Sequence, residues 1–260
     1  MPQRITGNNI NCLNCGTVIQ DNYCLQCGQP TDTGRITFKE TFTNFLRVAF
    51  ALEGPLWLTI RLLITNPGKL FREYVGGKRK TYYKPVAFFI LIAAIYLILR
   101  IWINFDPFEG VEDLINENPD LAEFSKSKFV TKLMEVARLM ENNINYQLFL
   151  LIFSIAISFK LFFSKKYNLA EYTSIGLYIT GVYALVRIIA MFFNKFAAVE
   201  VDDFELGALF LFIFYCSFSL FQKKNIGSVI RYALVSFFSL ILYFLFAIAT
   251  GLFLTILSLI

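Results

Sequence analysis

Five long apolar stretches occupy most of the last two thirds of the chain, and they constrain its fold more than any other feature. They cover residues 85–103, 146–163, 172–193, 204–221 and 232–260. A helix needs about 20 mostly apolar residues to cross the hydrocarbon core of a bilayer. The sequence therefore predicts an all-α integral membrane protein with five transmembrane helices over residues 85–260. The last stretch is long enough that it must tilt, protrude or break near Thr250–Gly251.

The charges between these stretches predict how the chain is oriented. Residues 1–85 carry eleven Lys and Arg against five Asp and Glu, whereas residues 104–145 carry nine acidic residues against four basic ones. Lys165 and Lys166 make the next connection basic, and the Lys/Arg excess alternates with every later crossing. Positively charged connections stay in the cytoplasm. We therefore expect a cytoplasmic N-terminus, an external C-terminus and an external acidic helical segment at 104–145.

Two CxxC pairs near the N-terminus form the only dense group of metal ligands in the sequence. They are Cys12-x2-Cys15 and Cys24-x2-Cys27, and a glycine follows each second cysteine. The two thiolates of such a pair close on one ion, and glycine accepts the positive φ that the turn requires. Four soft thiolates favour tetrahedral Zn²⁺, with iron as a weaker alternative. Residues 1–34 are therefore predicted to form a small four-cysteine zinc ribbon that holds one structural Zn²⁺.

Other roles for the cysteines stay open beside this one. Disulfides need an oxidising compartment, whereas the charge pattern places these residues in the reducing cytoplasm. A redox CxxC is usually single and lies at a helix N-terminus. A closed site of four thiolates has no open coordination position, so we do not expect catalysis there. The fifth cysteine, Cys216, lies within an apolar stretch and is predicted to be a buried small hydrophobic residue.

Residues 35–84 are predicted to form juxtamembrane amphipathic helices. The first follows a capping box at Thr37 and Glu40, the second begins at Pro55, and the third covers Lys69–Val75 after the turn Asn66-Pro67-Gly68. They either lie at the inner membrane surface or pack against the transmembrane helices, and both arrangements stay open. Four basic residues follow and are expected to bind anionic lipid: Lys78, Arg79, Lys80 and Lys84.

A series of short motifs occurs in order between residues 12 and 90. It comprises CxxCG, YCxxCGQ, Arg35-Ile36-Thr37, Asn66-Pro67-Gly68, Arg72-Glu73-Tyr74 and Gly77-Lys78-Arg79. Together they resemble domain-of-unknown-function family 3667, which consists of bacterial inner-membrane proteins with an N-terminal zinc ribbon. This resemblance implies zinc and the bacterial inner membrane, and it implies no activity. A cytoplasmic N-terminus, five spans and the Asn-Pro-Gly segment are also similar to the Yip1-like superfamily of membrane adaptors and shapers.

Ionisable residues inside the apolar stretches are few. Arg187, roughly six residues from the outer end of the third stretch, is a candidate for a functional buried charge. The alternative is an arginine that snorkels to the surface or is hydrogen-bonded internally. Glu171 and Glu205 are expected to cap helix N-termini. A polar stripe in the third stretch could line a path: Thr173, Ser174, Tyr178, Thr180 and Tyr183.

The sequence offers no catalytic signature. It contains no His, and it lacks the glycine-rich, Walker A, HExxH and GxSxG motifs. A net charge of +5 over 260 residues gives no reason to expect nucleic acid as a partner. We therefore expect a non-enzymatic adaptor or membrane organiser whose zinc ribbon docks a cytoplasmic protein. Exposed residues such as Asn14, Gln20, Asp21 and Gln26 are the expected contacts, and a small-solute transporter or channel is the alternative.

Overall fold

The computed structural model describes residues 10–12, 14–19, 22–27, 55–105, 144–197 and 202–257, with isolated positions between 115 and 134. The chain divides into two compact units, Met1–Ala49 and Phe50–Ile260. The helix predicted after Thr37 and most of the predicted acidic segment lie outside the described residues. The division at residue 50 means that the juxtamembrane helices that follow it pack with the transmembrane helices in one unit.

The described part of the first unit is a short β-hairpin followed by a second turn. Strands β1 (Ile10–Asn11) and β2 (Val18–Ile19) are antiparallel, with Asn11 opposite Val18. The turn between them contains the first CxxC pair. Gly16 has a φ of 75°, a left-handed conformation that favours glycine. The glycine expected to shape the turn therefore does so.

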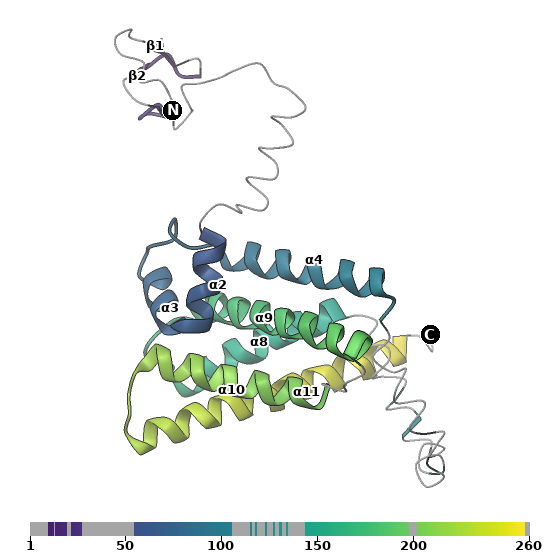
Figure 1. Ribbon diagram of the computed structural model, residues 1–260. Coiled ribbons are helices and arrows are strands. Elements are labelled where there is room, and N and C mark those ends of the chain that lie inside the picture. The colour runs from purple at the N-terminus through teal and green to yellow at the C-terminus, as the bar shows by residue number, and fades with distance from the viewer. Residues whose placement is uncertain are drawn as a thin grey trace. The chain divides into compact units, whose positions relative to one another are not determined.

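The second unit begins with a helical hairpin. Its helices are α2 (Pro55–Thr65) and α3 (Pro67–Val75), and Figure 1 shows them at the end of the bundle where the first long helix begins. The Asn66 side chain caps α3 by accepting a hydrogen bond from Lys69 N–H at 3.1 Å. Each helix buries one face, with Leu63 and Phe71 nearly inaccessible, while Trp57 is exposed. The expected packing against the long helices therefore holds for one face of the hairpin, and contact of the other face with the membrane surface stays a prediction.

Five further α-helices form the bundle: α4 (Pro85–Ile103), α8 (Ile144–Phe162), α9 (Leu169–Phe192), α10 (Asp202–Phe221) and α11 (Ile226–Leu257). Helix α9 contacts α4, α8 and α10, so it lies at the centre of the bundle, and it continues into a π-helical turn, η1 (Phe193–Ala197). Helix α11 packs against α8 and α10, and α3 packs against α10. The hairpin is thus part of the same packed body as the long helices.

Among the described residues, four segments are long and apolar enough to cross a membrane: Pro85–Ile103, Leu169–Phe196, Phe204–Phe221 and Ile226–Gly251. The stretch predicted at 146–163 does form helix α8, but the part of it with described side chains, Gln147–Phe162, is shorter than these four segments. A fifth crossing therefore stays a prediction. The last stretch does not break at Thr250–Gly251, because α11 continues without interruption to Leu257.

An aromatic cluster joins three helices at the end of the bundle where the hairpin lies. The rings of Phe163 and Phe221 stack with centroids 3.9 Å apart, and Tyr232 lies 6.0 Å from Phe163 and 6.1 Å from Phe221. The Tyr215 hydroxyl of α10 donates to the carbonyl of Thr65 at 2.8 Å, which links this cluster's helix to the hairpin. We call this end of the bundle the hairpin end. It includes the connections 163–168 and 222–225.

Candidate functional site

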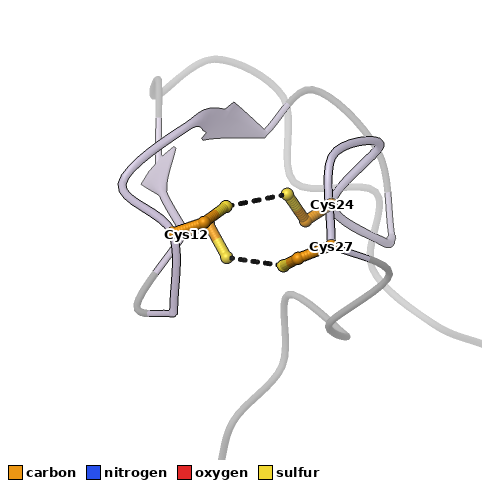
Figure 2. A group of neighbouring side chains, drawn as sticks. Cys12, Cys24 and Cys27 are labelled. Atoms are coloured by element: carbon orange, nitrogen blue, oxygen red, sulfur yellow. Dashed lines mark hydrogen bonds between the residues drawn. The ribbon is translucent and has the colours of Figure 1, made fainter.

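Four cysteine thiols come together in the first unit. The sulfur atoms of Cys12, Cys15, Cys24 and Cys27 all lie within 4.8 Å of one another. Figure 2 shows the sulfurs of the first CxxC pair facing those of the second. The Cys12–Cys27 and Cys15–Cys24 sulfur pairs are each 3.6 Å apart, too far for a disulfide bond. The sequence prediction that the two pairs form one group is therefore confirmed.

The backbone around the first pair is organised by short hydrogen bonds. Cys12 N–H donates to the Thr17 carbonyl and Gly16 N–H donates to the Cys12 carbonyl, each at 2.8 Å. Hydrogen bonds from the side chain and the backbone of Thr17 lower the pKa of the Cys15 thiol to about 6. Cys15 is therefore mainly a thiolate at neutral pH, the form that binds metal. Burial and the neighbouring Cys15 and Cys27 thiols instead raise the pKa of Cys24 to about 11.

This donor set fits a metal ion. Four thiolates around a tetrahedral Zn²⁺, each about 2.3 Å from the ion, would lie about 3.8 Å from one another. Two of the six sulfur–sulfur separations are 3.6 Å, close to that value, and none exceeds 4.8 Å. An ion held in this way has no open position for substrate or water. The group can therefore hold a metal, and its chemistry favours a structural role for the ion.

The surface around the thiols carries large exposed side chains. Leu25 is 95% exposed and Tyr23 is 61% exposed, although both flank the buried Cys24. Asn14 and Gln26, two of the four predicted contact residues, are also exposed, whereas Gln20 and Asp21 lie outside the described residues. Tyr23 and Leu25 were not among the contact residues predicted from the sequence. Their position beside a metal ligand, where they cannot reach a core of their own, is the signal that could have identified them.

The predicted lipid-binding residues lie between α3 and α4. Lys78, Arg79, Lys80 and Lys84 are all exposed. Lys78 forms an ion pair with Glu73 at 3.0 Å, and Tyr82 donates a hydrogen bond to the same carboxylate oxygen at 2.6 Å. These contacts, the Tyr82 hydrogen bond first, lower the pKa of Glu73. Burial and the hydrogen bond to Glu73 raise the pKa of Tyr82 to about 12. One acidic group therefore organises the start of the basic segment.

A second connection holds the hairpin to the bundle, and we call it the α3–α10 joint. Gly68 N–H donates to the Ser219 hydroxyl at 3.0 Å, and that hydroxyl donates to the Asn66 side chain at 3.1 Å. Arg72 donates to the carbonyls of Ser219 and Leu220 at 2.6 and 2.9 Å. The last carbonyls of a helix have no partner within the helix. Arg72 therefore caps α10 from a different part of the chain.

A buried tyrosine connects the hairpin to the central helix. Tyr178 of α9 donates its hydroxyl to the carbonyl of Tyr83, just before α4 begins. Its ring lies within 6.1 Å of the rings of Phe71, Tyr74 and Phe88. Tyr178, one residue of the polar stripe predicted in the third stretch, is thus used for packing and hydrogen bonding between helices, whereas Thr173 and Ser174 bond to carbonyls of α9 itself.

Arg187 lies in the half of α9 farthest from the hairpin end, and it is paired with an acidic residue. Its Nε atom is 3.2 Å from Oε2 of Glu205 on α10, and the two side chains are only 12% and 11% exposed. The Arg187 guanidinium also lies 5.5 Å from the ring centre of Tyr96 on α4. Tyr183 donates to the same Glu205 oxygen at 3.5 Å. Arg187 therefore connects three helices through a mostly buried ion pair.

Glu205 is the residue of this pair that the sequence analysis assigned to helix capping. The corresponding expectation holds for Glu171, since Asn168 and Glu171 form a reciprocal capping box at the start of α9 with distances of 2.7 and 2.8 Å. Glu205 instead directs its carboxylate at α9. Cys216 is fully buried in α10, as predicted.

Comparison with known proteins finds a family match for the segment that contains the α2–α3 hairpin and most of α4. Residues 53–97 match the family "Protein of unknown function (DUF3667)". The resemblance predicted from the motifs is therefore confirmed over this segment. No curated protein and no solved structure matches the chain, and the likeness to the Yip1-like superfamily is not shown.

The DUF3667 segment contains one side of each contact that fixes the hairpin. Asn66, Gly68 and Arg72 form the near side of the α3–α10 joint, and Tyr83 receives the hydrogen bond from Tyr178. The four clustered cysteines and the Arg187–Glu205 pair lie outside it. The DUF3667 segment thus consists of the α2–α3 hairpin and most of helix α4, which follows it in the chain.

Proposed function

We propose that this protein is a non-enzymatic membrane adaptor whose N-terminal ribbon binds one structural Zn²⁺ and docks a cytoplasmic protein. The observation that carries the proposal is the group of four thiols at Cys12, Cys15, Cys24 and Cys27. Because the chain supplies all four ligands, the bound ion serves to hold the two turns together. A small rigid surface attached to a membrane bundle is suited to binding a partner.

The surface of the ribbon supports this role. Tyr23 and Leu25 are exposed beside the buried Cys24. Exposed aromatic and aliphatic side chains on a rigid turn are typical anchors of protein interfaces, where tyrosine is enriched. The metal positions the turn that carries them, so the metal and the docking surface depend on each other.

The proposed setting is the bacterial inner membrane, with the N-terminus in the cytoplasm and α8 as a fifth crossing. The supporting observation is the charge at the hairpin end, where Lys165, Lys166, Lys223 and Lys224 are exposed in the connections between helices. Basic connections are retained on the cytoplasmic side. This orientation puts the ribbon and the hairpin on the side where a cytoplasmic partner is available.

A pull-down from detergent with the full chain tests the adaptor role. The variant Cys12→Ser/Cys15→Ser is expected to lose the metal and the partner together. The variant Tyr23→Ala/Leu25→Ser is expected to keep the metal and lose the partner, because it alters only exposed side chains. Substitution of the exposed Lys224 by Ala, outside the ribbon, provides a surface control that is expected to keep both the metal and the partner. An unchanged set of bound proteins in both double variants would show that the ribbon docks nothing.

A second candidate, small-solute transport through the bundle, is favoured by one observation. The Arg187–Glu205 pair places two opposite charges inside the half of the bundle farthest from the hairpin end. Charges at membrane depth commonly mark substrate or ion pathways. Flux into proteoliposomes would be compared for the wild type and Arg187→Gln. A flux that the substitution abolishes supports transport, and the absence of flux in both removes this candidate.

A further inference from the structure

Helix α2 presents an exposed face with the composition of a membrane-surface helix. Trp57, Arg61 and Ile64 follow at helical spacing and are exposed, whereas Thr59 and Leu63 on the opposite side are completely buried. Tryptophan prefers the headgroup level of a bilayer, and arginine can extend its charge toward phosphate while its stem lies on apolar atoms. The buried side fixes the rotation of α2, so this face cannot turn inward.

The basic segment is fastened to the same helix. Tyr83 N–H donates to the Thr59 hydroxyl at 2.9 Å, which ties residue 83 to the buried side of α2. Of the four basic residues in the segment, Lys78 is engaged with Glu73. Arg79, Lys80 and Lys84 are exposed, and no acidic side chain among the described residues pairs with them. Three cations are therefore available to an anion at this position.

The hairpin end as a whole is strongly basic within the described part of the chain. Its two acidic side chains, Glu73 and Glu171, are each committed to local hydrogen bonds. Its exposed cations are Arg61, Lys69, Lys78, Arg79, Lys80, Lys84, Lys165, Lys166, Lys223, Lys224 and Arg231. A surface of this kind attracts anionic lipid headgroups.

The hairpin is held at a fixed position, unlike a flexible polybasic tail. Gly68 and Arg72 bind the end of α10 through the α3–α10 joint, and Tyr178 of α9 binds the carbonyl of Tyr83. Helix α2 and the basic segment therefore have a constant depth relative to the bundle. A headgroup bound there meets the same set of side chains each time.

We propose that the α2–α3 hairpin and residues 78–84 form a binding surface for anionic phospholipids of the adjoining leaflet. The headgroup phosphates would lie against Arg61, Arg79, Lys80 and Lys84, and Trp57 would lie at the level of the glycerol backbone. This role is additional to protein docking by the ribbon and needs no protein partner. An acidic protein could also bind cations, but the exposed Trp57 and Ile64 beside Arg61 on the surface of a membrane bundle favour lipid.

The two tryptophans of the chain provide the test, because they lie at opposite ends of the membrane region. Trp57 is 71% exposed on α2, and Trp102 is 78% exposed at the far end of α4. Trp102→Phe leaves Trp57 as the single fluorophore, and Trp57→Phe leaves Trp102. The full chain would be placed in nanodiscs that contain equal amounts of phosphatidylglycerol and phosphatidylcholine. In each sample only one lipid carries bromine, which quenches tryptophan on contact.

We expect brominated phosphatidylglycerol to quench Trp57 about twofold more than brominated phosphatidylcholine, and both lipids to quench Trp102 equally. The triple substitution Arg79→Gln/Lys80→Gln/Lys84→Gln should remove the preference at Trp57. A matched triple substitution at the same end, Lys165→Gln/Lys166→Gln/Lys224→Gln, should keep it. Loss of the preference at high salt is also expected, because ions screen exposed charges.

Three results overturn the proposal. The first is equal quenching of Trp57 by the two brominated lipids in the protein whose single substitution is Trp102→Phe. The second is a preference that survives Arg79→Gln/Lys80→Gln/Lys84→Gln. The third is a Trp57 that neither lipid quenches, which would assign this face to another occupant such as an acidic protein. Trp102 is measured for each variant in the Trp57→Phe background. Quenching of Trp102 by brominated lipid shows that the protein is inserted in the bilayer. A variant that has lost this quenching is misfolded.

Discussion

Replacing Gly68 with alanine is expected to separate the start of α3 from the end of α10. A Cβ atom at this position would overlap the backbone carbonyl of Ser219 and lie 2.6 Å from Leu220 N, whereas ordinary contact begins at 3.4 Å. The obstructing atoms belong to the backbone, so no side-chain rotation relieves the overlap. The hairpin and α10 would have to move apart by roughly 1 Å.

That movement removes the hydrogen bonds of the α3–α10 joint. The bonds from Gly68 and Arg72 are 2.6–3.0 Å long. Lengthened by the required shift, they become about 3.6–4.0 Å long and are lost. Overpacking costs about 1–3 kcal/mol, and hydrogen bonds from a charged donor contribute about 1.5–3 kcal/mol each. The shift relieves the overlap but breaks these hydrogen bonds. We therefore expect the free energy that holds the α3–α10 joint closed to fall by about 3 kcal/mol.

Hydrogen exchange measures this loss directly. A local opening that is about 3 kcal/mol easier speeds exchange about 100-fold. Peptides covering residues 64–72 and 218–224 should show this change, while those from the centre of α9 should not. Gly207→Ala is the matched control, because this exposed glycine of α10 has no atom within 4 Å of the added Cβ. If Gly68→Ala exchanges like the wild type, the joint does not hold the hairpin.

Three further predictions concern the metal, the ion pair and an ionised carboxylate. Metal analysis should find about one Zn²⁺ per chain and background levels in Cys12→Ser, and two disulfides without metal would contradict the ribbon. Arg187→Gln and Glu205→Gln should each destabilise the protein by about 3–5 kcal/mol in detergent melting. The double variant should be destabilised by less than the sum of the two single losses, and additive losses would argue against coupling. Tyr82→Phe removes the hydrogen bond that chiefly lowers the pKa of Glu73. The stability that ionised Glu73 contributes is lost as pH falls through its lowered pKa. The difference in melting temperature between the wild type and Tyr82→Phe should therefore narrow as the solution becomes more acidic than the ordinary pKa of a glutamate, and a constant difference would refute this cause.

Local sequence signals predicted both helices of the α2–α3 hairpin, but they placed the start of α3 at Lys69, two residues late. Asn66-Pro67-Gly68 was expected to be a turn, whereas proline tolerates the first helical position and the helix begins at Pro67. Pro55 begins α2, Asn66 and Pro67 cap and begin α3, and α3 ends at Val75 before Gly76. Each of these features acts within a few residues, through a fixed φ, a missing N–H or a side-chain cap. The four clustered cysteines were predictable for a similar reason, because their spacing alone brings the thiols onto two adjacent turns.

The partners of Arg72 and Arg187 could not be predicted in this way. Arg72 binds backbone carbonyls 147 and 148 residues away, and a carbonyl has no sequence identity that marks it as a partner. Glu205 lies in the first turns of α10, where a capping role is an adequate interpretation of the sequence. Its direction toward Arg187 depends on how α10 is rotated against α9, and packing of the complete bundle decides that rotation.

The α3–α10 joint also determines an order of events during synthesis. Ribosomes add about 5–20 residues per second. The 147 residues between Arg72 and Ser219 therefore separate the two halves of the joint by roughly 7–30 seconds. During this interval the Arg72 guanidinium and the Gly68 N–H lack the partners that α10 supplies in the finished chain. A nascent chain that stops before α10 exposes both, which distinguishes it from a finished one for any quality-control protease that recognises unassembled helices.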